Sequence, residues 1–308
     1  MKILITGSNG MLAKNIVAAF KSSAAVHELI QVNRDDGDLR EQSTADDIIR
    51  RAAPDLIIHT AARVGGISAN IADPSGFLMD NLLIDSSVLR AASEHGVKDL
   101  LYLGSSCMYP RDYRQPLVES DILAAPLEPT NEGYAISKIA AAKYCQYASA
   151  QFGYNYKVIV PSNLYGAGDH YDLASAHLVA AALGKAHSAK VQGSKTIDVW
   201  GDGSARREFT FVGDLAQWIV DEHHNINNWP TILNVGCGID HSVTEIYLAA
   251  MKVVELNGTL EYDLSKPTGM KQKLMDSSQA IDKFGWKPKT SLIDGMKTAY
   301  AEFTATHA

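Results

Sequence analysis

The sequence holds few cysteines, few basic residues and no long apolar run, and each shortage excludes a class of function. Its 308 residues include only Cys107, Cys145 and Cys237, with neither a CxxC pair nor a metal-ligand spacing among them. This pattern predicts free thiols, a reducing cytoplasmic location and no bound metal. With 28 Lys and Arg against 35 Asp and Glu, the net charge of −7 disfavours a nucleic-acid surface, while a local pocket of donors remains compatible with a small anion.

No stretch approaches the roughly 20 apolar residues that a membrane span requires, so we expect no membrane partner. The opening MKILITGSNG is expected to be a strand entering a loop and is too short for the apolar core of a secretory signal. Neither an internal repeat nor a low-complexity segment occurs. The composition, 46% hydrophobic and 20% charged, is that of a globular chain with a sizeable core.

Short apolar runs alternate with segments of helical spacing in the N-terminal half. The runs have the length of buried strands: KILITG (2–7), ELIQVN (28–33), LIIHTA (56–61), LLYLGS (100–105) and KVIVPS (157–162). Apolar residues recur with helical period near 11–20, 77–88 and 132–151. Fully apolar strands separated by helices are typical of a parallel sheet covered on both faces. We therefore predict an α/β fold with a doubly wound parallel sheet of the Rossmann type.

The pattern loosens after residue 165. TILNVGCG indicates a further strand, and SVTEIYLAAMKVVE indicates a helix with Ser242 as N-cap and Glu245 at its N3 position. The tail is expected to form two short helices around a Gly-Trp-Lys-Pro turn. Because no linker rich in Pro, Gly or Ser separates the halves, we expect a smaller α/β lobe that interleaves with the Rossmann domain and leaves a cleft between them.

A glycine-containing loop follows the first predicted strand. ITGSNGMLA places Gly7, Gly10 and Ala13 at the end of that strand and in the start of the first helix. Glycine permits close backbone approach, and a helix N-terminus presents free N–H groups to a pyrophosphate. The spacing is GxxGxxA rather than GxGxxG, and a generic strand–helix turn is the alternative interpretation. Its position directly after the first strand favours a dinucleotide.

The end of the second strand bears on which dinucleotide binds. An NAD site usually ends this strand with an acid that hydrogen-bonds the ribose 2′-OH, whereas arginine accommodates a 2′-phosphate. Here the sequence is QVNRDD, so Arg34 favours NADP. Asp35 and Asp36 count against it, and a solvated loop charge is the alternative role for Arg34.

The stretch YAISK carries the predicted reactive pair. Tyr134 and Lys138 are four residues apart and share one face of a helix. We expect the ammonium to favour the phenolate and to lower the tyrosine pKa from its ordinary value of about 10. Such a tyrosine exchanges a proton with a carbonyl oxygen while hydride moves at its carbon. A chance surface pair is the alternative, and the phosphate loop upstream weakens it.

Together these segments resemble the extended short-chain dehydrogenase/reductase family, NAD-dependent epimerase/dehydratase type. The resemblance spans nearly the whole chain and rests on TGSNGMLA, TAARVGGI, LGSSCMYP, EPTNEGYAISK, PSNLYG, VWGDGSARREFTFVGDLA and NVGCG. RVGGI, SSCMYP and LEPTNEGYAISK point to one branch, the NADPH-dependent 3,5-epimerase-4-reductases of GDP-4-keto-6-deoxy-D-mannose. The resemblance thus implies a GDP-linked keto-deoxy-sugar as substrate.

The resemblance also implies catalytic roles. Ser105 and Tyr134 would hydrogen-bond the C4 carbonyl, and Lys138 would tune Tyr134 and hold the nicotinamide ribose. Cys107 and His177 would exchange protons at C3 and C5. Dehydratases carry an acid pair where this chain has Ser106 and Cys107, and a thiol, with an ordinary pKa of about 8.5, is a competent proton shuttle. The alternatives are a small buried hydrophobe for Cys107 and a core residue for His177.

Binding residues follow from the same resemblance. The implied contacts to NADP(H) are Gly7, Ser8, Asn9, Gly10, Met11, Leu12, Arg34, Ala61, Ala62, Leu103, Gly104, Ser105, Ser106, Tyr134, Lys138, Pro161, Ser162, Asn163, Leu164 and His177. The implied contacts to the nucleotide-sugar are Lys185, Trp200, Arg207, Asp263 and Lys266. Asn9 stands where relatives often carry an arginine to the 2′-phosphate. Lys185 offers the diphosphate a point charge where several relatives have arginine. For each exposed base, a solvated surface charge is the alternative.

The expected product is GDP-L-fucose or a close GDP-deoxy-sugar. A GDP-6-deoxy-heptose epimerase/reductase and a reductase that does not epimerise remain open. A non-catalytic NADP-binding scaffold is a further alternative, which the presence of both Tyr134 and Lys138 disfavours. We expect an NADP-binding domain at 1–165 with returning segments near 205–240, and a substrate-binding lobe at 166–204 and 241–308. A homodimer is implied by the resemblance.

Overall fold

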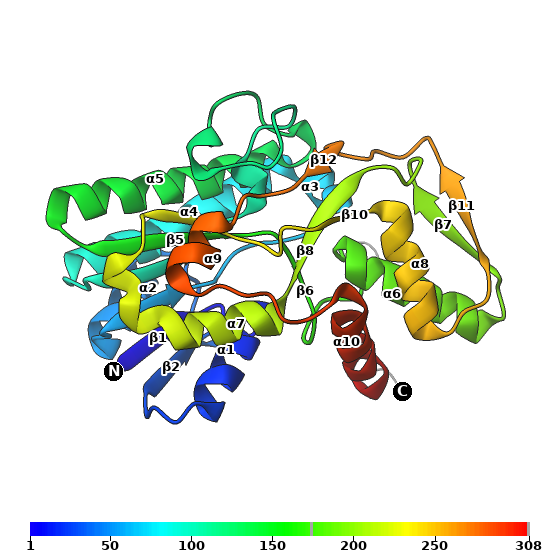
Figure 1. Cartoon of the computed structure of the whole chain (residues 1–308). Coiled ribbons are helices and arrows are strands. Elements are labelled where there is room, and N and C mark those ends of the chain that lie inside the picture. The colour runs from blue at the N-terminus through cyan, green and yellow to red at the C-terminus, as the bar shows by residue number, and fades with distance from the viewer. Residues whose placement is uncertain (173–174, 307–308) are drawn as a thin grey trace.

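A six-stranded parallel sheet lies at the centre of the N-terminal part of this computed structural model, which describes residues 1–172 and 175–306 (Figure 1). The strand order is β2-β1-β3-β4-β5-β9. The strands are β1 (Lys2–Thr6), β2 (Glu28–Val32), β3 (Leu56–His59), β4 (Asp99–Leu103), β5 (Asn155–Pro161) and β9 (Ile232–Val235). The predicted doubly wound parallel sheet is confirmed, and each of the first five strands ends one or two residues earlier than expected.

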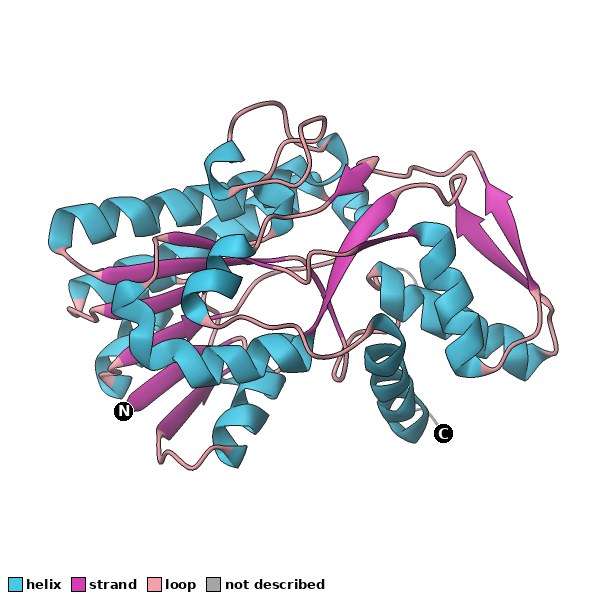
Figure 2. Ribbon diagram, viewed as in Figure 1, coloured by secondary structure: helices cyan, strands magenta, loops and turns pink. Residues whose placement is uncertain are grey.

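Helices cover both faces of this sheet, as Figure 2 shows. One face packs against α1 (Met11–Ser22) and α7 (Val212–Glu222), the other against α2 (Gln42–Ala52), α4 (Pro74–Glu94) and α5 (Glu132–Phe152). Along β1, Ile3 and Ile5 point to the first layer and Leu4 to the second, and all three are fully buried. Burial on both faces explains why these strands are continuously apolar.

The order of the strands places a crevice at the carboxyl ends of β1 and β3. From β1 the chain moves to β2 on one side and then returns to form β3 on the other side. Connections leave the sheet in opposite directions at this point, and open α/β sheets bind ligands at such a position. The glycine-containing loop after β1 therefore opens into the expected binding crevice.

The C-terminal part is a second, smaller α/β layer. Its core lies among α6 (Leu178–Gln192), α8 (Val243–Val254) and α10 (Leu292–Thr306). The strand β8 (Arg206–Phe211) pairs with β10 (Asp240–Ser242), β12 (Gln272–Lys273) and β6 (Asn163–Tyr165), and β7 (Thr196–Trp200) pairs with β11 (Thr259–Asp263). These small sheets were not foreseen from the sequence, because their strands are short and pair with segments far away in the chain.

The chain passes repeatedly between the two parts, as Figure 1 shows for α7 and α9 (Ser278–Phe284). Ala280 and Trp286 are fully buried in the same apolar cluster as α1 and α7, so α9 packs with the large sheet although it follows β12 in sequence. Our division into an NADP-binding domain and a substrate-binding lobe stays a proposal.

Local signals at the helix ends were predictive. At α8 the Ser242 side chain accepts from Glu245 N and the Glu245 carboxylate accepts from Ser242 N, so the expected capping box is present. The tail holds two helices around the predicted turn, but α10 is longer than expected, with 15 residues. The helix α2 and the short helix α3 (Ile67–Ala72) were not predicted. Within the described residues, none of the helices has the length and apolarity needed to span a membrane.

Candidate active site

The loop after β1 is shaped for close approach of a ligand to the backbone. Gly7 has φ +67°, and a Cβ there would lie 2.7 Å from the Cα of Ala61, which follows β3. Only glycine fits such a position. Gly10 is the N-cap of α1, and no side chain caps the free N–H groups of the first turn. Uncapped N–H groups at a helix N-terminus are suited to a pyrophosphate, so the residues present fit a dinucleotide.

The other predicted cofactor contacts lie at the carboxyl edge of the same sheet. Ser8, Asn9, Met11 and Leu12 belong to the loop and first turn of α1; Ala61 and Ala62 follow β3; Leu103, Gly104 and Ser106 lie at the end of β4; Pro161, Ser162, Asn163 and Leu164 lie at the end of β5 and in β6. The Ser162 and Thr210 hydroxyls are 2.7 Å apart, and Asn163 Nδ2 donates to Glu208 O. These two side chains thus help to fasten β6 to β8.

Arg34 lies in a short helical turn after β2 with its side chain exposed. Asn33 caps this turn by accepting from Asp35 N, and the Asp36 carboxylate accepts from Asn33 N at 2.8 Å. The Asp36 carboxylate is therefore engaged in the cap. In the described part of the chain, Arg34 forms no ion pair within 4.0 Å, so its guanidinium is available to a 2′-phosphate.

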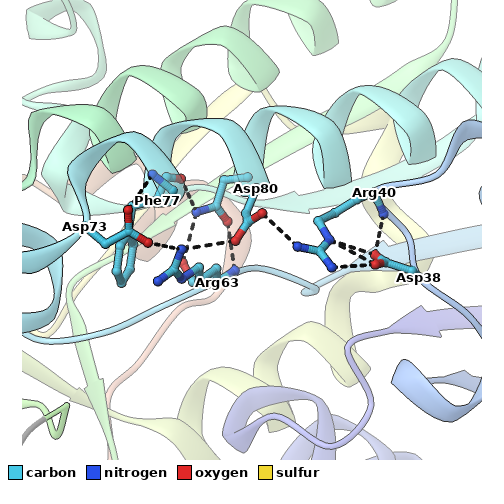
Figure 3. Close-up of polar contacts among 8 residues, drawn as sticks. Asp38, Arg40, Arg63, Asp73, Phe77 and Asp80 are labelled. Carbon is cyan, nitrogen blue, oxygen red and sulfur yellow. Dashed lines mark hydrogen bonds and ion pairs between the residues drawn. The ribbon is translucent and has the colours of Figure 1, made fainter.

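Two other arginines on this edge are already paired, as Figure 3 shows. Asp80, on α4, lies between Arg40 and Arg63 and accepts from one at 3.0 Å and from the other at 3.1 Å. Arg40 also binds Asp38, and Arg63 binds Asp73. These pairs tie the loops after β2 and β3 to α4, which frames the crevice without leaving a free charge on either arginine.

The predicted serine and cysteine lie on one short turn at the end of β4. Ser105 is the N-cap of the turn Ser106–Met108, and its Oγ accepts from Cys107 N at 3.2 Å. Ser105 and Cys107 are both half-buried, while Ser106 is buried. The turn thus holds a hydroxyl and a thiol beside each other at the carboxyl edge of the sheet.

Lys138 is held beneath this turn by three contacts. Its Nζ donates to Leu103 O at 3.1 Å, lies 3.9 Å from Asp85 Oδ2 and lies 4.6 Å from the centre of the Tyr102 ring. Burial lowers the pKa of Lys138, and the negative charge of Asp85 opposes that shift. The lysine is therefore fixed in one position inside the protein.

Asp85 joins this lysine to the end of β1 through a buried chain of hydrogen bonds. Tyr102 OH donates to Asp85 Oδ2 at 2.6 Å, and His59 Nε2 lies 3.1 Å from Asp85 Oδ1. On its other side His59 Nδ1 lies 2.6 Å from Thr6 Oγ1. The sequence analysis missed this chain, although an acid on the apolar face of a predicted helix was a visible signal.

The pKa of the Tyr134 phenol differs from the expectation. Its pKa is raised, first by burial and then by the negative charges of Cys107 and Asp85, while a hydrogen bond with Ser105 opposes the shift. Lys138 Nζ is 5.9 Å from the centre of the Tyr134 ring. The predicted depression of the phenol pKa is therefore wrong for this structure, because desolvation outweighs the ammonium. A phenol that keeps its proton suits a general acid.

The sulfur of Cys107 faces two nitrogen donors that the sequence analysis did not select. Asn131 Nδ2 is 3.0 Å from Sγ, and Lys273 Nζ is 3.9 Å from it. Asn131 Oδ1 is buried and has no hydrogen-bond partner among the described residues. Asn131 lies within LEPTNEGYAISK, so the signal was present, whereas nothing near Lys273 in sequence indicated its location.

His177 lies at the N-cap position of α6 and is half-buried. Its pKa is lowered, first by burial and then by the positive charges of Lys273 and His170. The loop after β3 holds the preceding residues, since Gly66 N donates to Ser175 O at 3.0 Å. The predicted acid–base partner is thus a neutral imidazole within electrostatic reach of Lys273.

Four of the predicted nucleotide-sugar residues, namely Trp200, Arg207, Asp263 and Lys266, adjoin one cavity by sequence or contact, although none of them lines it. The cavity, about 390 Å³, is lined by Arg111, Asp112, Gly201, Asp202, Ser204, Ala205, Leu264, Thr268, Gly269 and Lys271. Trp200 is 37% exposed beside it, with Lys266 Nζ 5.6 Å from its ring centre. Arg207 Nη2 donates to Thr268 O, and Asp263 accepts from Ser265.

Lys185 has a different environment. It is not among the residues that line the cavity, and its Nζ donates to Asp198 Oδ2 at 2.6 Å and to Asp198 O at 2.9 Å. A diphosphate at this lysine would have to share it with that carboxylate. No cluster of three or more His, Cys, Asp or Glu side chains that could hold a metal ion occurs within residues 1–172 and 175–306.

The site combines a dinucleotide crevice at the switch point of a doubly wound sheet with a tyrosine and a lysine near a serine at the end of β4. This combination defines an enzyme of the short-chain dehydrogenase/reductase class. Residues 3–236 match the sequence profile of the NAD dependent epimerase/dehydratase family. The chain belongs to that family.

Individual relatives are similar over nearly their whole length. The GDP-L-fucose synthase of Azorhizobium caulinodans is 42% identical over 97% of this chain and 95% of that protein. The GDP-L-colitose synthase of Yersinia pseudotuberculosis is 41% identical over 96% of each. Among solved structures, a GDP-mannoheptose C4 reductase from Campylobacter jejuni with NADP bound has a TM-score of 0.87 and 30% identity, covering 98% of each chain.

Proposed function

We propose that this protein is an NADPH-dependent epimerase-reductase that inverts C3 and C5 and reduces C4 of a GDP-4-keto-6-deoxy-hexose, yielding GDP-L-fucose or a close GDP-deoxy-sugar. One observation carries the proposal. The Tyr134 phenol hydrogen-bonds the Ser105 hydroxyl and lies close enough to Cys107 for the charge of that sulfur to raise the phenol pKa. A hydroxyl, a phenol and a thiol at one point suit a ketone whose neighbouring carbons exchange protons. Curated GDP-L-fucose synthases at 36–42% identity support it.

Each side chain has a separate task in this mechanism. Ser105 and Tyr134 hydrogen-bond the C4 oxygen and stabilise the enolate that forms when C3 or C5 loses a proton. Cys107 and His177 remove and return those protons on the sugar. Tyr134, which retains its proton because burial raises its pKa, then protonates the C4 oxygen. NADPH supplies the hydride when bound.

The cofactor site is proposed from the geometry of the sheet edge. The uncapped N-terminus of α1 would hold the pyrophosphate, Arg34 the 2′-phosphate and Lys138 the nicotinamide ribose. The GDP part of the substrate is assigned to the cavity of about 390 Å³ and to the adjoining Trp200, Arg207, Asp263 and Lys266. Lys185, which does not line this cavity, is assigned to the diphosphate in competition with Asp198.

A GDP-heptose reductase is a second candidate, favoured by the likeness to the Campylobacter jejuni enzyme. One experiment separates the candidates: the purified protein is incubated in D₂O with NADPH and GDP-4-keto-6-deoxymannose, and the product is identified by NMR. We expect NADPH oxidation and deuterium at C3 and C5, and a Tyr134→Phe variant serves as the matched control. NADPH oxidation without deuterium would indicate a reductase only, and binding without turnover would indicate the scaffold. A higher kcat/KM for a GDP-4-keto-heptose would favour the second candidate.

Homodimerisation and a cytoplasmic location complete the proposal. The helices α4 and α5 pack on each other and expose apolar side chains on their outer faces, namely Met79, Leu83, Ile136 and Tyr147. A second copy of the chain would cover this surface, and light scattering after gel filtration measures the mass. Three free thiols support a reducing compartment.

A further inference from the structure

The sulfur of Cys107 accepts from two nitrogen donors, a pattern that suits an anion better than a thiol. Asn131 Nδ2 lies 3.0 Å and Lys273 Nζ 3.9 Å from Sγ. A neutral thiol has its own weak proton to donate, whereas a thiolate only accepts. An ammonium this close favours the charged form of a sulfur.

Lys273 is an unusual lysine because it is buried without a carboxylate partner. Its residue is 7% exposed, and in the part of the chain that the structure describes no carboxylate lies within 4.0 Å of its Nζ. Burial lowers the pKa of Lys273, and the charge of Cys107 is the first effect that opposes this shift. A buried ammonium is expensive unless it is paired, so the sulfur is its natural counter-ion.

The backbone holds this lysine firmly in place. Lys273 lies in β12, which pairs in parallel with β8. The next two residues are anchored on both sides: Leu274 N donates to Gln115 Oε1 at 2.8 Å, and Met275 N donates to Glu208 Oε2 at 2.9 Å. Glu208 is itself 1% exposed and also accepts from Gly238 N. These contacts fix the backbone around Lys273, so that its side chain extends toward the Cys107 sulfur from a rigid position.

We propose that Lys273 is a positioning residue that stabilises the thiolate of Cys107 by donating to its sulfur, with Asn131 as second donor. This proposal rests on the proposed function, because Cys107 acts as a proton acceptor only if the protein epimerises its substrate. In that step the sulfur lone pair takes the proton of the C–H bond, and the C–H bonding pair becomes the enolate. A solvent proton relayed through His177 restores the C–H bond on the opposite face, and the thiol returns its proton to solvent. The same ammonium disfavours an imidazolium at His177.

Other ionisable groups also act on the sulfur and on Lys273. Arg207 on β8 adds a second positive charge, and Tyr134 on α5 is close enough for the charge of Cys107 to raise its pKa. The negative charge of Glu128 acts on Lys273 and partly offsets the positive charge of that lysine. Arg207 donates to two carbonyl oxygens, Arg206 O and Thr268 O, and no hydrogen bond from it to the sulfur occurs among the described residues, whereas Lys273 Nζ lies 3.9 Å from Sγ. Lys273 is therefore the group to change.

The test measures alkylation of Cys107 by iodoacetamide in the full-length protein, between pH 6 and pH 10, with mass spectrometry of the Cys107 peptide. Lys273→Met and Lys273→Gln are compared with Lys273→Arg, which keeps the charge, and with Lys287→Met, which removes an exposed lysine elsewhere. We expect the first two to move the midpoint of the alkylation profile upward by about one pH unit and to slow alkylation at pH 7 about tenfold. Lys273→Arg is expected to stay within about twofold of the natural chain.

Cys237 provides an internal reference, because burial, with Glu208 adding to it, raises its pKa to about 11 and its alkylation should not respond to Lys273. A thermal melt of each variant checks folding. If Lys273→Met does not fold, Asn131→Asp gives an independent measurement, since a carboxylate beside the sulfur should also slow alkylation. Identical profiles for the natural chain and the folded, charge-removing variants would overturn the proposal. No substrate is used, so this failure is distinct from failure of the epimerase assay.

Discussion

Replacing Asp85 by asparagine should destabilise the protein far more than the same change elsewhere on its helix. The carboxylate accepts from Tyr102 OH at 2.6 Å, lies 3.1 Å from His59 Nε2 and 3.9 Å from Lys138 Nζ. The amide keeps the shape but loses the charge, and its NH₂ group cannot accept from both neighbours. Removing one partner of a buried ion pair costs about 3–5 kcal/mol, because the other charge is left uncompensated.

The pH dependence of this loss has a defined sign. The pKa of Lys138 is already lowered by burial, and Asp85 opposes the shift, so the pKa falls further in Asp85→Asn. Between the folded value and the unfolded value of about 10.4, the unfolded chain binds more protons and stability rises with pH. Asp85→Asn should therefore begin to recover stability at a lower pH than the natural chain does.

Urea unfolding followed by circular dichroism at pH 7 and pH 9.5 measures both effects. Asp80→Asn is the matched control, since Asp80 lies on the same helix but is partly exposed, with 24% of its side chain accessible. Partly exposed pairs contribute about 1 kcal/mol or less. The reasoning is refuted if the free energy of unfolding of Asp85→Asn lies within about 1 kcal/mol of that of the natural chain. It is also refuted if the difference between the two free energies does not shrink as the pH rises.

The remaining predictions concern the cofactor and the two proton-transfer groups. Tyr134→Phe should abolish reduction while NADPH affinity, measured by fluorescence titration, stays largely intact; unchanged turnover would remove the phenol from the mechanism. Cys107→Ser should slow deuterium uptake far more than hydride transfer to an already epimerised ketone, and equal losses in both assays would contradict the division of labour. Gly7→Ala should weaken NADPH binding at least tenfold, because the new Cβ would lie 2.7 Å from the backbone of Ala61. Arg34→Ala should reduce the preference for NADPH over NADH, as compared by kcat/KM, and an unaltered preference would place the 2′-phosphate elsewhere.

Local sequence patterns predicted the sheet and the reactive pair because their determinants lie within a few residues. The strands KILITG and LIIHTA are apolar throughout since both faces of the sheet are covered, and this is visible from composition alone. Tyr134 and Lys138 share a helix face by spacing. The capping box of α8 also depends on a spacing of three residues.

Features that depend on distant segments were beyond such patterns. Lys273 reaches Cys107 across 166 positions of sequence, and its strand is too short to give a period. The raised pKa of Tyr134 reflects burial by several elements, which no single window reveals. Lys185 was expected to bind a diphosphate, but it donates to Asp198, which lies on β7, a strand that was not predicted.

The position of β12 has a consequence for anyone who builds chimeras between relatives. Lys271 lines the large cavity, and two residues later Lys273 reaches the cysteine. A graft of this stretch, intended only to alter which nucleotide-sugar is accepted, would also replace the counter-charge of the sulfur. Donor segments without a cation at the second position would yield hybrids that recognise a new ligand yet invert its stereocentres poorly.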